Sequence, residues 1–240
     1  MQGAQAGGAM VAVAANFTTA ARELAREFEA RTDHTVKMSF GSTGKLYAQI
    51  ANGAPYEVFL AGDTERPALA VKAGLADPDS RFTYATGRLV LWSPRSHLFE
   101  DGESYLREAD FQRLAIGNPA TAPYGLAAFQ ALSRLNLWAD LSPKLVRGES
   151  IAQTFQFVAT GNVETGFVAL AQLQEWSGES GTTWAVPEHL HEPIAQQAVL
   201  LHKGLHSHAA RAWLEFLRSP EALAIIEQYG YGVALATPTP

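Results

Sequence analysis

Four short turns in this chain place small or uncharged polar residues at the expected starts of helices. Each turn follows an apolar, strand-like run, and the four are Ala15-Asn16-Phe17-Thr18, Gly41-Ser42-Thr43-Gly44, Ala122-Pro123-Tyr124-Gly125 and Gly148-Glu149-Ser150-Ile151. The first N–H groups of a helix have no partner within the helix, and the helix dipole adds partial positive charge there. Several such starts, if they converge, would hold an anion without a basic side chain.

The residue types in these turns also favour a particular kind of anion. Hydroxyl, side-chain amide and backbone N–H groups donate hydrogen bonds, and the turns contain almost no acid. A fully deprotonated dianion needs only donors, whereas phosphate is partly protonated at neutral pH and favours an acceptor such as Asp. Glu149 is the nearest acid, and we expect it to point away from the anion. The turns therefore favour a fully deprotonated oxyanion.

Helix capping is the competing interpretation of the same residues. Ser, Thr and Asn often cap helix starts, and a cap contributes about 1 kcal/mol. The residues open to this interpretation are Asn16, Thr18, Ser42, Thr43 and Ser150. Capping accounts for each turn alone but not for four uncharged helix starts at corresponding positions.

The elements that position the turns alternate between strand and helix. The first series has strands at Met10–Ala14, His34–Phe40 and Val58–Ala61, with helices at Thr18–Thr32, around Leu46 and Ile50, and at Thr64–Ala73. The second has strands at Leu114–Gly117, Leu145-Val146 and Gly166–Leu170, with helices at Gly125–Leu135, Ile151–Thr160 and Ala171–Trp176. Long extended runs are expected at Arg81–Trp92 and Ile194–His202, and two final helices at Ser207–Leu217 and Pro220–Tyr229. Such alternation predicts parallel sheets covered by helices.

The simplest assembly is two α/β lobes, with the second inserted into the first. We expect residues 10–86 with 196–236 to form the first lobe, residues 87–195 the second, and residues 1–9 a disordered N-terminal remnant. Ligands of open α/β sheets bind beyond the carboxyl ends of the strands, where all four turns are expected to lie. Two turns from each lobe predict a ligand cleft between the lobes, which hinge closure would bury.

Composition excludes several other functions. The chain has no cysteine, which rules out disulfides, thiolate catalysis and thiolate metal sites. A formal net charge of −6 argues against nucleic acid or an anionic membrane surface as the partner. No apolar run approaches the roughly 18 residues of a membrane span. No nucleophile-elbow or phosphate-loop motif is present, so we expect no enzyme activity.

The histidines offer the most plausible metal ligands. They are His189, His191, His202, His206 and His208, and none has an acidic partner at a recognised ligand spacing. A solvated surface is therefore the favoured interpretation. Asp63 is expected to cap the third helix. Lys45 either assists an anion at longer range or is a solvated surface charge, and its flexible stem favours the second.

Several motifs together resemble the periplasmic molybdate-binding proteins of ABC importers. They are Val13–Thr18, Phe40–Ile50, Asn52–Phe59, Asn118-Pro119, Ala122–Ala127, Gly166–Leu170 and Glu227–Tyr231. The resemblance extends from Ala12 to Gly232. It implies a two-lobed type II periplasmic binding protein fold, each lobe a mostly parallel sheet flanked by helices. It also implies that molybdate or tungstate is bound between the lobes and delivered to a membrane permease.

The resemblance further assigns ligand residues. Asn16 falls on the first ligand turn, Ser42 and Thr43 on the second, Tyr124 on the third and Ile151 on the fourth. We expect Tyr124 and Ile151 to contribute backbone N–H groups. The ring of Tyr124 is then either an aromatic lid or core packing, and the side chain of Ile151 is a core residue. The metal arrives as an oxyanion, so no cofactor and no direct metal coordination by the protein are implied.

Two departures from relatives change the expected donor set. Some relatives have a hydroxyl residue just before Asn16, where this chain has Ala15, so Ala15 can offer only its backbone. Other relatives have a Tyr at the end of the later strand, where this chain has Ala169, so no phenol from that position reaches the anion.

The resemblance also implies a periplasmic monomer that does not insert into the membrane. Ala4-Gln5-Ala6 resembles the end of a removed secretory signal, although a frayed terminus explains it equally well. Two alternatives remain open. One is a binding protein of the same fold for sulfate or another small solute, and the other is an oxyanion-sensing domain.

Overall fold

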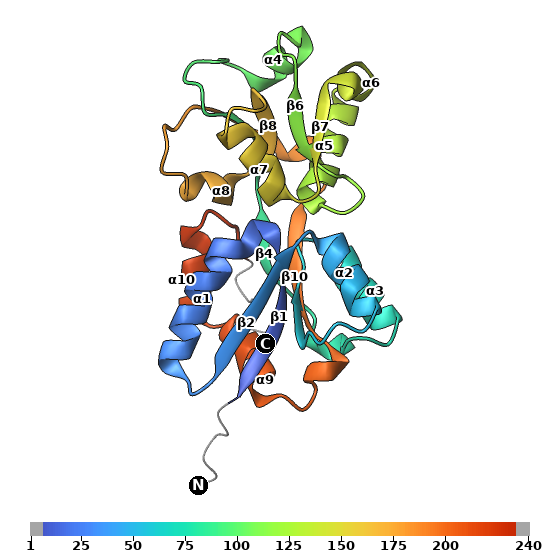
Figure 1. The fold of residues 1–240 in the computed structure, drawn as a ribbon, viewed down its shortest axis with the longest axis vertical. Coiled ribbons are helices and arrows are strands. Elements are labelled where there is room, and N and C mark those ends of the chain that lie inside the picture. The colour runs from blue at the N-terminus through green and yellow to red at the C-terminus, as the bar shows by residue number, and fades with distance from the viewer. Residues whose placement is uncertain (1–6, 234–240) are drawn as a thin grey trace. The chain divides into compact units, whose positions relative to one another are not determined.

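The chain divides into two compact units in the computed structural model, which describes residues 7–233 (Figure 1). Unit 1 contains the described residues up to Thr86 and those from Ala195 onward, and unit 2 is Gly87–Ile194. The chain therefore passes between the units twice.

The expected N-terminal remnant is corrected by the start of the first strand. Residues 1–6 lie outside the described residues, but Gly8 and Ala9 begin strand β1 (Gly8–Ala14) and pair with Thr35 and Val36. Ala9 is buried in the sheet. Gly8 and Ala9 thus belong to the fold, because they complete the register between β1 and its neighbour.

Unit 1 is built on a five-stranded sheet in the order β2-β1-β3-β10-β4. Its strands are β1, β2 (Thr35–Gly41), β3 (Val58–Leu60), β4 (Phe82–Gly87) and β10 (Ile194–Leu200). Strand β1 runs parallel to β2 and β3, whereas β10 runs antiparallel to β3. Strands β4 and β10 are the two at which the chain passes between the units.

Helices cover both faces of this sheet. They are α1 (Thr18–Arg31), α2 (Thr43–Ala51), α3 (Glu65–Lys72), α9 (His208–Phe216) and α10 (Pro220–Gln228), with the 3-10 turns η1 (Ala15–Phe17), η2 (Pro78–Ser80) and η5 (His202–Gly204). Helix α1 packs beside α10, and α2 packs beside α3 on the other side of the sheet (Figure 1). Residues Val11 to Ala14 of β1 are buried, as expected for a strand covered on both faces.

Unit 2 repeats this architecture in the order β7-β6-β8-β5-β9. Its strands are β5 (Leu89–Ser93), β6 (Leu114–Gly117), β7 (Leu145–Gly148), β8 (Thr165–Ala169) and β9 (Thr182–Ala185). Strand β6 is parallel to β7 and β8, and β5 is antiparallel to β8. In this arrangement β6 corresponds to β1 of unit 1, and β5 corresponds to β10. The helices are α4 (Gly102–Glu108), α5 (Pro123–Arg134), α6 (Trp138–Leu141), α7 (Ile151–Ala159) and α8 (Leu170–Gln174), with the 3-10 turns η3 (Ser142–Lys144) and η4 (Glu188–Leu190).

Alternation along β5 shows how the core of unit 2 is divided. Leu89 and Leu91 pack in one cluster with α5, whereas Val90 and Trp92 pack in another with α7. Successive side chains of a strand point to opposite faces of its sheet. An apolar run without polar alternation is therefore the pattern of a strand buried on both faces.

The expected fold class is confirmed, because two five-stranded sheets are flanked by helices. Two local expectations differ from the structure. The extended run Arg81–Trp92 is two strands, β4 and β5, which belong to different sheets. Strand β9 was not expected, and it pairs antiparallel with β5. None of the helices formed by residues 7–233 has the length and apolar character needed to cross a bilayer.

Candidate functional site

Within each unit, the two predicted turns lie at one edge of the sheet. Ala14 of β1 pairs with Gly41 of β2, and the first and second turns follow at once. Gly117 of β6 pairs with Gly148 of β7, ahead of the third and fourth turns. Because paired parallel strands end at the same edge, each unit brings two helix starts together.

Asn16 in the first turn directs its side-chain amide into the interior of unit 1. Its Nδ2 lies 2.8 Å from Oε1 of Gln196 and 3.3 Å from the hydroxyl oxygen of Tyr231. The Tyr231 hydroxyl donates in return to the carbonyl oxygen of Asn16, at 2.6 Å. Both amide hydrogens of Asn16 are therefore used within unit 1. The backbone N–H groups of the turn are then its candidate donors to a ligand.

Ser42 in the second turn does not act as a helix cap through its side chain. It is the N-cap residue of α2, yet its hydroxyl makes no cap hydrogen bond. Ser42 is only 4% exposed, and its Oγ has no hydrogen-bond partner among residues 7–233. A buried hydroxyl without a partner costs about 1–3 kcal/mol. Such an atom at a helix start is a candidate donor to a ligand.

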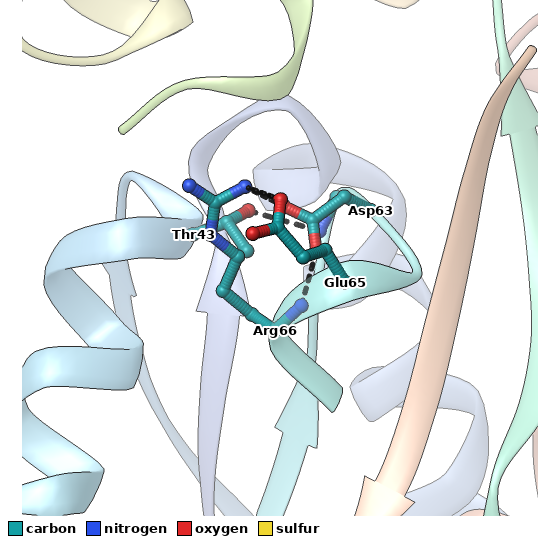
Figure 2. A network of polar contacts seen from close by, with 5 residues as sticks. Thr43, Asp63, Glu65 and Arg66 are labelled. Carbon is teal, nitrogen blue, oxygen red and sulfur yellow. Dashed lines mark hydrogen bonds and ion pairs between the residues drawn. The ribbon is translucent and has the colours of Figure 1, made fainter. Parts of the chain in front are cut away.

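Thr43 is oriented by the turn that follows β3. Its side chain is 1% exposed, and Oγ1 accepts a hydrogen bond of 3.0 Å from the N–H of Gly62 (Figure 2). A hydroxyl has one proton to donate, and Gly62 occupies only a lone pair. The proton of Thr43 therefore points away from Gly62.

An ion-pair cluster lies beside Thr43 (Figure 2). The carboxylate of Asp63 accepts from the backbone N–H of Arg66 at 2.9 Å and from its Nη1 at 3.1 Å. The same Nη1 lies 2.9 Å from Oε2 of Glu65. Burial raises the pKa of the Asp63 carboxyl, and the hydrogen bond and charge of Arg66 oppose that rise.

Asp63 therefore caps the start of α3, as the sequence predicts. The formal N-cap residue is Thr64, which makes no side-chain cap bond, and the carboxylate of Asp63 takes that role instead. Lys45 in the first turn of α2 is exposed, which agrees with a surface position.

Tyr124 in the third turn is a core residue of unit 2. It is the second residue of α5, is 1% exposed, and belongs to the core cluster that also contains residues of β5, β6 and β8. Of the two interpretations of the ring, packing is therefore correct. Gly125 is required here, because a Cβ at that position would lie 2.3 Å from the carbonyl oxygen of Gly117. The glycine lets α5 begin directly against the end of β6.

Thr121, just before this turn, was not anticipated as a functional residue. Its Oγ1 is buried and has no hydrogen-bond partner among the residues that the structure describes. The only signal in the sequence is a hydroxyl residue in the loop between β6 and α5. Thr121 offers the third turn an additional donor.

The fourth turn separates a structural cap from a candidate ligand residue. Ser150 caps α7, since its Oγ accepts a hydrogen bond of 3.2 Å from the N–H of Gln153. Ile151 is the first residue of α7 and its side chain is buried in the core of unit 2, as expected. Glu149 is exposed. The backbone amide of Ile151 therefore stays the candidate donor of this turn.

The donor set contains no obvious cation or metal ligand. Across residues 7–233, no three His, Asp or Glu side chains are placed so that they would hold a metal ion. Ala169 ends β8 and is fully buried, so that position supplies no side-chain donor. The turns bring together hydroxyl and backbone N–H groups at helix starts, which suits an acceptor-only anion.

Comparison with known proteins identifies the class of this molecule. The family described as bacterial extracellular solute-binding protein matches residues 9–232, and the chain belongs to that family. The molybdate-binding protein ModA of Azotobacter vinelandii is 50% identical over 231 residues, which are 96% of this chain and 92% of that protein. ModA of Rhodobacter capsulatus is 48% identical over 228 residues, 95% of this chain and 89% of that protein.

A solved structure shows a closely similar fold. The periplasmic molybdate-binding protein of Azotobacter vinelandii aligns with a TM-score of 0.90 and 38% sequence identity. The alignment covers 95% of this chain and 100% of that chain. The resemblance expected from the sequence motifs is thus confirmed.

Proposed function

We propose that this chain binds the oxyanion molybdate, and tungstate with it, and delivers the anion to the permease of an ABC importer. The observation that carries the proposal is the buried hydroxyl of Ser42, which has no partner among residues 7–233 and lies at the start of α2. The relatives named as molybdate-binding proteins support the choice of oxyanion. The family, described as extracellular, supports a periplasmic location.

The proposed binding mechanism uses donors alone. Ser42 and Thr43 donate through their hydroxyl protons, and Ala15, Asn16, Tyr124 and Ile151 donate through backbone N–H groups. Molybdate carries no proton at neutral pH, so its oxygens accept every one of these bonds.

Local dipoles must provide the attraction, because the chain as a whole is acidic. The formal net charge is −6, and Arg66, the cation beside Thr43, is paired with Asp63 and Glu65. Helix starts then supply most of the positive potential. The family of bacterial extracellular solute-binding proteins supports a transport role for the bound anion.

Sulfate is the alternative ligand that the same chemistry allows. Sulfate and molybdate are both tetrahedral dianions with only acceptor oxygens, so hydrogen bonding alone does not separate them. We propose that the size of the site separates the two anions, because molybdate is the larger one. We also propose that the protein acts as a monomer.

Isothermal titration calorimetry with four anions tests this function. Molybdate and tungstate should each bind tightly with one site per chain, whereas sulfate and phosphate should bind far more weakly or not at all. Phosphate should bind weakly because the proposed donor set contains no carboxylate to accept its proton. Heat from sulfate but none from molybdate or tungstate would contradict the proposal and favour the sulfate alternative.

A further inference from the structure

A buried polar cluster surrounds the first turn, and Gln196 is at its centre. Gln196 lies on β10 and is 0% exposed. Its Oε1 accepts from Nδ2 of Asn16 at 2.8 Å and lies 3.1 Å from the hydroxyl oxygen of Tyr84 on β4. One oxygen therefore joins the first turn to both strands at which the chain passes between the units.

Tyr231 also forms hydrogen bonds with Asn16. Its hydroxyl donates to the carbonyl oxygen of Asn16 at 2.6 Å and lies 3.3 Å from Nδ2 of Asn16. The ring of Phe17 packs edge-on against Tyr84 and Tyr231, with centroid distances of 4.8 and 5.2 Å. Asn16 is thus fixed through its backbone carbonyl and through its side-chain amide.

This arrangement does more than fill the core. Buried polar groups must be fully hydrogen-bonded to offset their desolvation, so apolar side chains would fill the same space with less risk to stability. What the cluster provides is a single defined orientation of Asn16. Asn16 in turn lies in the Ala15–Phe17 turn, the first of the proposed anion-binding turns.

We propose that Gln196 is a positioning residue for oxyanion binding. It holds the amide of Asn16 inward, and the backbone N–H groups of the Ala15–Phe17 turn are thereby aimed at the anion. This role rests on the proposed function. Gln196 does not touch the anion, and its effect on affinity passes through Asn16.

Substitution of Gln196 by Met tests this role, because Met has a similar volume and cannot accept the hydrogen bond from Asn16. Molybdate affinity, measured by calorimetry, should fall about tenfold in Gln196→Met. Gln197→Met is the matched control on the same strand. The amide of Gln197 lies 3.4 Å from Oγ1 of Thr83 rather than near Asn16, so affinity should stay within about twofold of wild type.

A double-mutant cycle separates positioning from a general loss of structure. In the Asn16→Ala background, Gln196→Met should lower affinity no further, because the amide through which Gln196 acts is absent. Affinity losses that simply add would overturn the positioning role. So would a folded Gln196→Met protein that binds molybdate as tightly as wild type.

A second variant covers the case in which Gln196→Met does not fold. If Gln196→Met does not unfold cooperatively on heating, Tyr231→Phe replaces it, since that change removes the bond to the Asn16 carbonyl and keeps the ring packing. Its affinity should also fall, and wild-type affinity in Tyr231→Phe would overturn the proposal. A wild-type chain that binds no molybdate would instead overturn the proposed function, and the positioning role with it.

Discussion

At the scale of single residues, four serines in similar positions have different roles. Ser42, Ser150, Ser207 and Ser219 are all N-cap residues, and three of them accept a backbone hydrogen bond of 3.2 Å through Oγ. Ser42 makes no such bond. Residue type therefore predicted either a cap or a ligand, and the hydrogen bonds identify Ser150, Ser207 and Ser219 as caps.

Ser42→Ala should weaken molybdate binding without destabilising the protein. A hydrogen bond to a charged group contributes about 1.5–3 kcal/mol, so affinity should fall at least tenfold. No hydrogen bond to residues 7–233 is lost and the cost of an unpaired buried hydroxyl is removed, so the thermal midpoint without ligand should be unchanged or higher. Calorimetry and thermal unfolding measure the two effects.

The matched control for this change is Ser219→Ala. Ser219 caps α10, and its loss should lower the free energy of unfolding by about 1 kcal/mol and leave affinity unchanged. Equal affinity of wild type and Ser42→Ala would remove Ser42 from the site.

The direction of the Asn16 side chain could not be predicted from the sequence. Asn16 was expected among the ligand residues, and the sequence motif does place it on the first turn. Its amide points inward because of Gln196 and Tyr231, which lie 180 and 215 positions further along the chain. Such partners come together only through the tertiary fold, so local pattern could not predict them.

At the scale of elements, regular patterns predicted most of the helices and strands. Ala20, Leu24 and Phe28 recur at helical spacing and are all buried in α1, and strand β6 was predicted at its observed bounds. Strand β9 was missed because it begins at Thr182, inside a stretch rich in Gly, Ser and Thr that usually indicates a loop. The pairing of β9 with β5 depends on the sheet rather than on local sequence.

Helix α4 provides a pH-dependent prediction. The carboxylate of Asp101 accepts from the N–H of Ser104 at 2.8 Å, and this bond holds the pKa of Asp101 below its usual value. A carboxyl with a lowered folded-state pKa stabilises the protein above its unfolded pKa, about 4, and loses that effect as pH falls through the folded value. Asp101→Ala should therefore lower the free energy of unfolding by about 1 kcal/mol at pH 7.

Denaturant unfolding at pH 7 and at pH 3 measures this contribution. The deficit of Asp101→Ala relative to wild type should be smaller at pH 3, because pH 3 lies below the unfolded pKa of about 4 and the stabilisation decreases as pH falls toward the lowered folded pKa. Asp101→Asn keeps a cap that does not titrate, so it should retain most of the stability at both pH values. A deficit of the same size at both pH values would show that the carboxylate charge is not involved.

At the scale of the whole molecule, two units of the same strand order each present two helix starts at one sheet edge. An acidic chain can thereby supply an anion shell from dipoles and hydroxyls rather than from cations. The repeat of architecture was predicted from alternating strands and helices, although the two halves show no sequence repeat. The choice of molybdate could not come from the donor chemistry alone, which fits sulfate as well.

Diffraction from crystals grown with molybdate, with data collected on both sides of the molybdenum absorption edge, would locate the metal directly. We predict one molybdenum atom whose oxygens lie within about 2.7–3.2 Å of Ser42 Oγ and of backbone amides at the helix starts. No carboxylate or imidazole should contact it. A molybdenum atom bound elsewhere, or coordinated directly by Asp, Glu or His side chains, would contradict capture by helix starts and hydroxyl donors.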